Sequence, residues 1–199
     1  MNKLYFESHN KGKINSANKY ATLYGESFIP IDLSIVEPDI NNVEETAKMK
    51  VLTSYDILKS PCFANDTGFY IEGYPFEKDF PGAYTNRKLL EPIGIEGLIR
   101  IMNGIDNRRC YFEDCVAFYD GNELKVFRTF SKGRLSNSIS SKHNPIEWSP
   151  LWKVFIPEGY DKVLSEFTPE ELKERDKSKE SSLKDFFKWY SNVYEKRLR

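Results

Sequence analysis

The chain has 199 residues, 40% of them hydrophobic and 15% aromatic, which is enough for one large domain or two small lobes around a buried core. A formal net charge of −1 is not the basic excess of a general nucleic-acid binder, so a small-molecule ligand is favoured over RNA or DNA. No apolar stretch approaches about 18 residues and no apolar signal segment opens the chain, which predicts a cytoplasmic protein without membrane association.

The cysteines, Cys62, Cys110 and Cys115, are odd in number and form no Cys-x-x-Cys pair. Neither a disulfide framework nor a zinc site is therefore indicated, because both need thiols at suitable spacings. Each of the three lies in an apolar, strand-like run. We expect all three to be buried free thiols.

The first apolar run predicts a strand over residues 4–7, followed by a polar turn and a helix over residues 14–23 that Gly25 closes. The inward residues of this helix are predicted to be Ile14, Ala17, Ala21 and Leu23. A strand-to-helix turn aims backbone N–H groups and the positive end of the helix dipole at one point, which suits phosphate. The P-loop pattern fails here, because Glu7 and Ile14 stand where it needs a glycine and a hydroxyl, so a plain surface turn stays an open alternative.

The next segments predict a strand over residues 28–33 and a long helix that starts at Asn42, with Glu45 three residues later. One face of this helix is predicted to carry Val51, Leu52, Tyr55 and Leu58. The stretch PCFANDTGFYIEGY predicts two strands separated by a break at Gly68. The polar group Asn65-Asp66-Thr67 would then lie at a strand end, where α/β proteins often place their chemistry.

The second half predicts a short helix over residues 94–104 and a hairpin over residues 108–135 that turns at Asp120-Gly121. A strand and turn follow at residues 151–160, and the polar run 171–182 is expected to be a solvated loop or helix face. The apolar stripe of the amphipathic closing helix is Leu183, Phe186, Phe187 and Tyr190. Early crossovers and later hairpins together predict an α/β fold, a two-lobed mixed sheet with flanking helices and a central cleft.

Acidic residues lie at several predicted element ends: Glu37, Asp66, Glu72 and Asp79. Carboxylates that converge on one cleft would hold magnesium, which accepts oxygen ligands and keeps water and substrate phosphates in its shell. Taken singly, each acid is more often a capping or turn residue. Lys13, Lys50 and Arg87 could face phosphates across the same cleft, and a metal, cations and a carboxylate together suit phosphoryl chemistry.

A series of motifs runs along the chain. Ser8, Asn10 and Lys13 follow the order Ser/Thr-x-Asn-x-x-Lys in the first turn, Asp66 lies in NDTG, and the segments FPGAYTNR, SKGRLS and FIPEGYDKVLSEFTPEE follow in that order. Over almost the whole chain, this series resembles the family of inosine/xanthosine triphosphate pyrophosphatases, which cleanse the nucleotide pool. Such a resemblance is far more specific than any one motif.

The resemblance implies roles for individual residues. Asp66 takes the place of the catalytic and metal-associated aspartate, although Asn65 replaces the usual acidic neighbour. Glu37 and Glu72 would complete a Mg²⁺ site with Asp66. The residues implied to bind the substrate at its phosphate end are Ser8, Asn10, Lys13, Lys50, Thr67 and Arg87.

The departures from the family pattern concern the residues that would read the base. The family has Gly-Phe/Trp-Asp-Pro where this chain has EWSPLWKVF, which leaves Trp148 or Trp152 as the aromatic and no aspartate in either alignment. The later Ser-His-Arg aligns with Ser178, Lys179 and Glu180, so the serine is kept and the histidine and arginine are replaced. A buried site left with mismatched hydrogen bonds loses about 1 to 3 kcal/mol for each mismatch.

The leading interpretation is a single domain over residues 1–199, with two lobes, that acts as a Mg²⁺-dependent nucleoside triphosphate pyrophosphatase. It would cleave a nucleoside triphosphate to a monophosphate and pyrophosphate, with altered or relaxed base choice. The family also implies a homodimer. The alternative is a nucleotide-binding protein that kept the fold and lost turnover, which Asn65 supports and the retained Asp66, Lys13 and Lys50 oppose.

Overall fold

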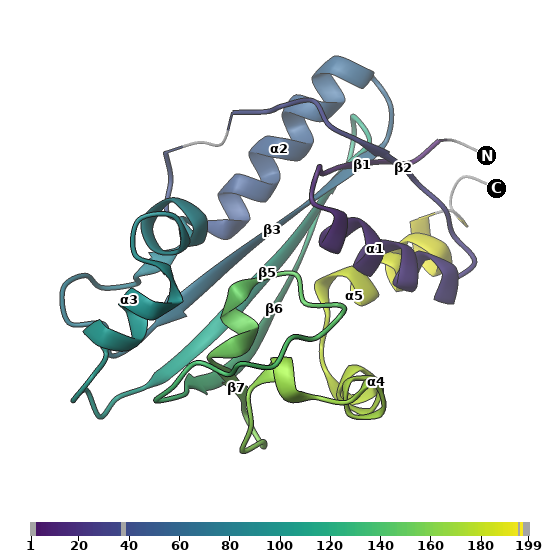
Figure 1. The fold of residues 1–199 in the computed structure, drawn as a ribbon. Coiled ribbons are helices and arrows are strands. Elements are labelled where there is room, and N and C mark those ends of the chain that lie inside the picture. The colour runs from purple at the N-terminus through teal and green to yellow at the C-terminus, as the bar shows by residue number, and fades with distance from the viewer. Residues whose placement is uncertain (1–2, 37–38, 195, 197–199) are drawn as a thin grey trace. The chain divides into compact units, whose positions relative to one another are not determined.

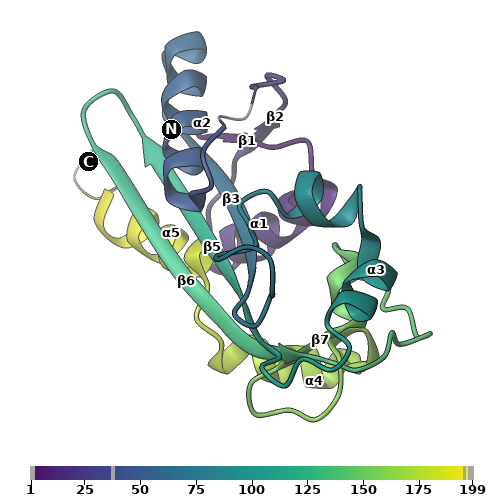
Figure 2. The same cartoon turned by 90° about the vertical axis from the view of Figure 1, so that its left-hand side faces the viewer.

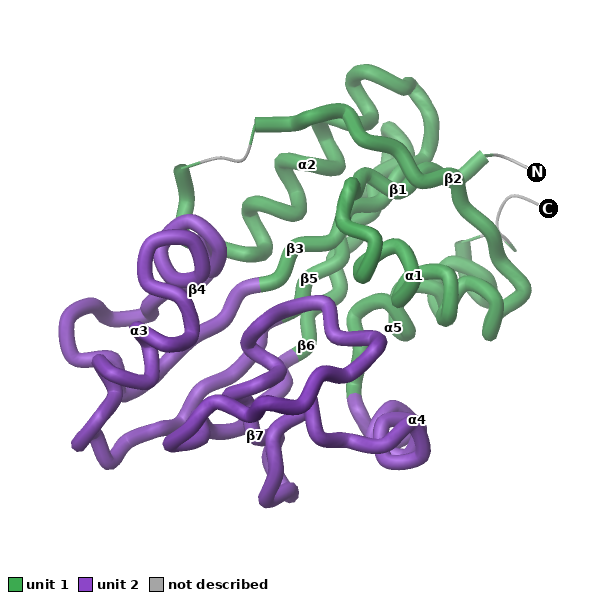
Figure 3. The backbone as a smooth tube through the Cα atoms, in the orientation of Figure 1, with its two compact units in different colours: residues 1–67, 114–129, 180–199 green, residues 68–113, 130–179 purple. Residues whose placement is uncertain are grey.

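The computed structural model describes residues 3–36, 39–194 and 196. The chain divides into two compact units, each built from separate stretches of sequence (Figure 3). Unit 1 contains residues 1–67, 114–129 and 180–199, and unit 2 contains residues 68–113 and 130–179. Because β3 (Cys62–Ile71), β5 (Arg109–Tyr119) and β6 (Leu124–Leu135) each cross a unit boundary, these strands contribute residues to both units.

The sheet of unit 1 has the strand order β2-β1-β3-β5-β6. The first two strands are β1 (Tyr5–Glu7) and β2 (Ile29–Ile31), and β1 pairs in parallel with both β2 and β3. The hairpin between β5 and β6 turns at Asp120-Gly121 as predicted, with a positive φ of 98° at Gly121. A Cβ at this glycine would collide with the hydroxyl of Tyr55, so the turn requires glycine for two reasons.

Three helices cover the sheet of unit 1: α1 (Lys11–Leu23), α2 (Val43–Leu58) and α5 (Ser182–Trp189), which a π-helical turn over Tyr190–Tyr194 extends (Figure 1). The helices α1 and α5 lie side by side in Figures 1 and 2. Side chains alternate along β3, so Phe63 packs with α1 and α5 while the Cys62 thiol donates to the carbonyl of Val51 on α2. The two faces of this strand therefore meet different helices.

Aromatic packing fills the core of unit 1. Phe6 and Phe63 stack with ring centroids 4.4 Å apart, and Phe186 packs against Phe63 at 4.7 Å. The stripe predicted for the closing helix is confirmed, because its four residues are all buried. On α1 the prediction was wrong at one position: Leu23 is 64% exposed, and Tyr20 is buried with Ala17 and Ala21, because those three share a face at helical spacing.

Two further corrections concern α2 and β3. Leu52 on α2 is exposed, whereas Val51 and Ser54 are buried. The predicted break at Gly68 is wrong, because β3 runs without interruption from Cys62 to Ile71. Pairing explains the continuity: β3 pairs with β1 at its start, and Phe69 and Tyr70 pair with β4 (Pro81–Gly82) near its end. The group Asn65-Asp66-Thr67 therefore lies inside a strand and not at its end.

Unit 2 contains β4, β7 (Phe155–Pro157), α3 (Gly94–Ile101), α4 (Pro169–Ser178) and the continuations of β3, β5 and β6. A π-helical segment spans Thr85–Leu90, and 3-10 turns span Pro150–Lys153 and Leu164–Glu166. Its core includes Phe69, Phe112, Phe155 and Leu98. The predicted short helix and late strand are confirmed. Most of the polar run 171–182 lies on α4, which is the helical one of its two predicted alternatives.

All three cysteines are buried free thiols, as predicted. Burial raises the pKa of the Cys62 thiol to about 12 and raises the pKa of Cys110 further, so neither is a reactive thiolate at neutral pH. Among the helices of the described residues, none is both long and apolar enough to cross a bilayer.

Candidate functional site

The turn after β1 is shaped by two of the residues predicted to bind phosphate. Asn10 is the N-cap of α1, and its Oδ1 accepts hydrogen bonds from the backbone N–H groups of Gly12 and Lys13 at 2.9 and 3.1 Å. The Ser8 hydroxyl oxygen accepts from the N–H of Asn10 at 3.2 Å. Side-chain capping of this kind fixes where the helix begins. The turn is thus a defined helix start, and Lys13 lies in the first turn of α1.

Two lysines reach the same short segment of β3. The Lys13 Nζ donates to the backbone carbonyl of Asn65 at 3.0 Å. From α2, the Lys50 Nζ lies 3.2 Å from the Asp66 Oδ1, and the two side chains are only 14% and 9% exposed. Lys13 on α1 and Lys50 on α2 therefore contact two adjacent residues of β3, Asn65 and Asp66. A buried, paired carboxylate and ammonium of this kind form a stronger electrostatic unit than a surface ion pair.

The other face of the same segment carries a polar network that the sequence did not predict. The Asp114 Oδ1 on β5 accepts hydrogen bonds from the Asn65 Nδ2 at 2.9 Å and from the Thr67 hydroxyl at 2.8 Å. The second oxygen of Asp114 accepts from the hydroxyl of Ser182, the first residue of α5. Asn65 also donates to the carbonyl of Cys115 at 3.1 Å. The neutral Asn65 is thus tied to an acid on the neighbouring strand.

Glu7 is a second buried acid of unit 1 that the sequence did not predict to lie near the site. It ends β1, is 7% exposed, and accepts the N–H of Leu33 with both carboxylate oxygens, at 3.3 and 3.2 Å. Burial raises the pKa of Glu7, and the Leu33 N–H and the nearby charge of Lys50 act in the opposite direction. Glu7 pairs with Ala64 on β3, and side chains two residues apart on a strand share a face. Glu7 therefore lies on the same face of the sheet as Asp66, the face that α2 covers.

The residues predicted to read the base lie in unit 2. Trp148 is 38% exposed and packs edge-to-face on Phe112 at 5.7 Å. Trp152 is 7% exposed, and its buried Nε1 has no hydrogen-bond partner among the residues that the structure describes. Of the two alternative positions, Trp148 has the ring surface that a base could stack on. Ser149, which stands in place of an aspartate, caps the 3-10 turn by accepting the N–H of Leu151.

Other predicted residues of unit 2 make contacts within this unit. The Ser178 hydroxyl donates to the carbonyl of Arg175 at 3.1 Å, and Lys179 is the C-cap of α4. The Arg87 guanidinium lies 4.1 Å from the ring centroid of Tyr84. Their predicted contacts with substrate stay predictions.

The metal-binding prediction named three carboxylates. Glu37 lies outside the described residues. The Glu72 Oε2 in unit 2 forms an ion pair with the Arg109 Nε at 2.7 Å. Within the described part of the chain, no group of three or more His, Cys, Asp or Glu side chains could hold a metal. Asp66 alone still fits magnesium, because this ion is usually bound through one or two carboxylates together with substrate phosphates.

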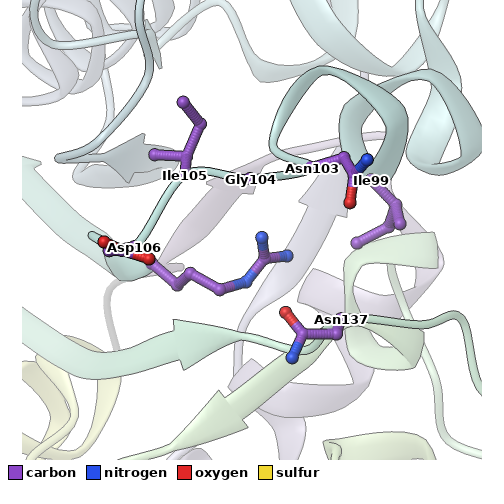
Figure 4. Close-up of a pocket in the computed structure, with 7 residues that line it drawn as sticks. Ile99, Asn103, Gly104, Ile105, Asp106 and Asn137 are labelled. Atoms are coloured by element: carbon purple, nitrogen blue, oxygen red, sulfur yellow. The ribbon is translucent and has the colours of Figure 1, made fainter.

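A cavity of about 350 Å³ lies in unit 2, at the end of α3 (Figure 4). Its lining includes Asn103, Asp106 and Asn137, whose polar side chains Figure 4 shows around the opening. Arg108 also lines it, but its guanidinium donates to the carbonyls of Met102 and Leu135 at 2.8 and 3.0 Å. Burial lowers the pKa of Arg108. None of the residues predicted to bind substrate lines this cavity.

The fold and the site define a class: an α/β protein in which a lysine from a capped helix start and a lysine from a second helix contact the strand segment that carries a buried aspartate. The chain belongs to the Ham1 family, whose model matches residues 4–189. It is 29% identical to the dITP/XTP pyrophosphatase of Thermococcus kodakarensis over 187 residues, which cover 94% of this chain and 96% of that protein. The dITP/XTP pyrophosphatase of Pyrococcus horikoshii is also 29% identical, over 190 residues and the same shares of both chains.

Solved structures agree on the fold. The Ham1 protein of Staphylococcus aureus matches with a TM-score of 0.73 and 21% identity, over 98% of this chain and 99% of that chain. A HAM1 protein from Coxiella burnetii matches with a TM-score of 0.75 and 15% identity, over 98% of this chain and 100% of that chain. The predicted fold class and family are confirmed.

Proposed function

We propose that this chain is a nucleoside triphosphate pyrophosphatase that releases a nucleoside monophosphate and pyrophosphate and cleanses the nucleotide pool of the cytoplasm. The observation that carries the proposal is the buried pair of Lys50 and Asp66, with Lys13 bonded to the same strand segment. The two relatives described above are named dITP/XTP pyrophosphatases, which supports the reaction class.

The residues around Asp66 suit hydrolysis of the anhydride between the α- and β-phosphates. Water attacks phosphorus, the bridging P–O bond breaks, and pyrophosphate leaves with the electron pair. Lys13 and Lys50 would bind phosphate oxygens and offset the negative charge that develops on them. Asp66 would orient the attacking water or hold a metal ion, and its pairing with Lys50 limits the directions in which the carboxylate can point.

Ham1 pyrophosphatases generally depend on a divalent metal, and we propose Mg²⁺ for this chain. Asp66 and Glu37 would hold it together with phosphate oxygens, and Glu72 stays a third predicted ligand. The bound ion would neutralise charge on the phosphates and on the leaving pyrophosphate. The phosphate end of the substrate would be held by Ser8, Asn10, Lys13, Lys50, Thr67 and Arg87.

Base selection is the part of the proposal in which we expect this chain to differ. Trp148 would stack on the base, while Ser149 offers a hydroxyl where the family has an aspartate. Ser178 and Lys179 take the positions aligned with the Ser-His-Arg motif. Because stacking is tolerant of the base, we propose altered or relaxed specificity.

We also propose that the chain forms a homodimer. Light scattering at micromolar concentration tests this proposal: the mass of a dimer is expected, and the mass of a monomer would contradict it.

A second candidate is a nucleotide-binding protein of the same fold without turnover. Asn65 supports it, because an uncharged residue beside Asp66 leaves fewer carboxylates for a metal than an acidic pair would. The retention of Asp66 together with Lys13 and Lys50 supports the enzyme, because a carboxylate and two lysines around one strand segment suit phosphoryl chemistry.

One experiment separates the two candidates. Pyrophosphate release is measured with canonical and deaminated nucleoside triphosphates in the presence of Mg²⁺, and again after chelation of the metal. Release that chelation abolishes is expected. Binding of triphosphates by calorimetry without any release would favour the second candidate, and neither binding nor release would exclude both.

A further inference from the structure

Asp114 holds the residues on both sides of Asp66. Its Oδ1 accepts from the side chains of Asn65 and Thr67, at 2.9 and 2.8 Å, so one carboxylate oxygen bridges two positions of the strand. Alternate side chains on a strand point to opposite faces, and Asp66 therefore projects to the other side, against Lys50. Fixing Asn65 and Thr67 on one face fixes the direction of Asp66 on the other.

The same carboxylate is anchored from a third direction. Its other oxygen accepts from the hydroxyl of Ser182, and the backbone N–H of Ser182 donates to the hydroxyl of Thr129 on β6 at 3.2 Å. Asp114 thus connects β3, β5, β6 and the start of α5, all within unit 1. The positive end of the α5 dipole also favours a negative charge at this position.

The network extends to a predicted phosphate ligand. Asn65, whose side chain donates to Asp114, presents its carbonyl to the Lys13 Nζ at 3.0 Å. Any shift of residues 65–67 would move both Asp66 and the acceptor that holds Lys13. We propose that Asp114 is a positioning residue for the hydrolytic reaction: it clamps residues 65–67 and thereby sets the placement of Asp66 and Lys13. This inference rests on the proposed function.

The test compares Asp114→Ala, Asp114→Asn and the matched control Asp120→Ala. Asp120 belongs to the same unit and also accepts three hydrogen bonds, from Asn122, Glu123 and Tyr194, all at 2.8 Å, but it lies at the hairpin turn. For Asp114→Ala we expect kcat to fall by about 10- to 100-fold with KM within about 3-fold, the scale that a misplaced catalytic group produces. Asp120→Ala should leave both constants unchanged.

The conservative variant tests the mechanism of the clamp. The amide oxygen of Asp114→Asn can still accept from Asn65 and Thr67, so its kcat is expected to stay within about 3-fold of the wild type. If Asp114→Asn is as impaired as Asp114→Ala, the carboxylate charge matters and the clamp is wrong. Wild-type kcat in Asp114→Ala, or an equal fall in Asp120→Ala, would also overturn it.

Hydrogen exchange decides the inference without any enzyme activity. In Asp114→Ala the amides of residues 62–71 should exchange about 10-fold faster or more, while Asp120→Ala should affect the hairpin turn alone. Unchanged exchange over residues 62–71 overturns the clamp. If the wild type releases no pyrophosphate from any nucleotide, the proposed function fails, and the exchange result alone then supports or rejects the clamp.

Discussion

The two units use their predicted site residues in different ways. In unit 1, Lys13 donates to the carbonyl of Asn65 and Lys50 pairs with the adjacent Asp66, so α1, α2 and β3 contribute to one polar network. In unit 2, Trp152 belongs to the apolar core, and the Ser178 hydroxyl donates to a carbonyl three residues earlier on its own helix. Lys50 and Asp66 are buried and paired in the first unit, whereas the residues of the second that were predicted to read the base are aromatic or lie at the end of α4. The charged site residues of unit 2, Glu72 and Arg87, contact Arg109 and Tyr84.

This difference separates two kinds of recognition. The phosphates are common to every nucleoside triphosphate, and a contact with them carries no information about the base. Residues that are buried and bonded from several sides suit such an invariant task, because they keep one geometry for every substrate. The half-exposed Trp148 suits a group that varies, because every base has a face that can stack. The predictions below test this division.

The largest effect is expected at Asp66. Asp66→Asn should lower turnover by about 100-fold or more for every nucleotide, the scale seen when a catalytic acid–base or charge-stabilising group is lost. Asp56→Asn is the matched control, because the Asp56–Lys59 pair has the same separation of 3.2 Å but lies exposed on α2. Steady-state kinetics and thermal unfolding of both variants check this. Turnover like that of the wild type in Asp66→Asn would remove Asp66 from the mechanism.

A smaller loss is expected at Lys13. Lys13→Ala should lower kcat/KM by about 10- to 100-fold, since a charge-assisted hydrogen bond contributes roughly 1.5 to 3 kcal/mol. The factor should be similar for purine and pyrimidine triphosphates. Lys19→Ala, at an exposed position of the same helix, serves as the control and should change little. A loss that varies strongly with the base would place Lys13 near the base and contradict the division between the units.

The sequence predicted much of unit 1 because its signals are local. Asn42 and Glu45 marked the start of α2, and the Asn42 side chain does accept the N–H of Glu45. The prediction at Gly68 was wrong because a glycine often interrupts a strand, whereas here pairing partners along both parts of β3 keep the strand extended.

Asp114 and Glu7 escaped prediction for a related reason. The partners of Asp114 lie 49 residues before it and 68 residues after it, so no local pattern marks the network. Glu7 follows the apolar Phe6 in a short strand, and its buried carboxylate accepts the N–H of Leu33, 26 residues away. Long-range hydrogen bonds of this kind are visible only once the chain has folded.

The base end provides the next test. The ratio of kcat/KM for inosine or xanthosine triphosphate to that for the canonical purines should stay below about 100-fold, which corresponds to roughly 2.7 kcal/mol. Trp148→Ala should lower kcat/KM for every nucleotide by about 5- to 100-fold, the range for loss of a stacked base. Trp152→Phe should keep the core packed and change the ratio between nucleotides little. A preference of 100-fold or more would show that other residues read the base.

The smallest expected effect concerns stability and Glu7. Burial raises the pKa of Glu7, so the folded protein favours its neutral form more than the unfolded chain does. The stability that this shift contributes is complete below the unfolded pKa of about 4.3 and is lost as the pH rises through the folded pKa. Glu7→Gln is neutral at every pH and keeps an oxygen for the Leu33 N–H. It should therefore melt at a higher temperature than the wild type at pH 8 and at about the same temperature at pH 4.

Asp120 provides the opposite sign within the same unit. Burial acts to raise its pKa, but the N–H groups of Glu123 and Asn122 and the Tyr194 hydroxyl outweigh it, and the pKa is lowered. Asp120 therefore stabilises the folded state above its unfolded pKa, and this stability is lost as the pH falls through the folded pKa. Asp120→Asn should melt below the wild type at pH 8, by a margin that shrinks toward acid pH. Melting curves of both variants at several pH values measure these differences. If the melting temperature of Glu7→Gln differs from that of the wild type by the same amount at every pH, the charge of Glu7 carries no cost in the folded protein.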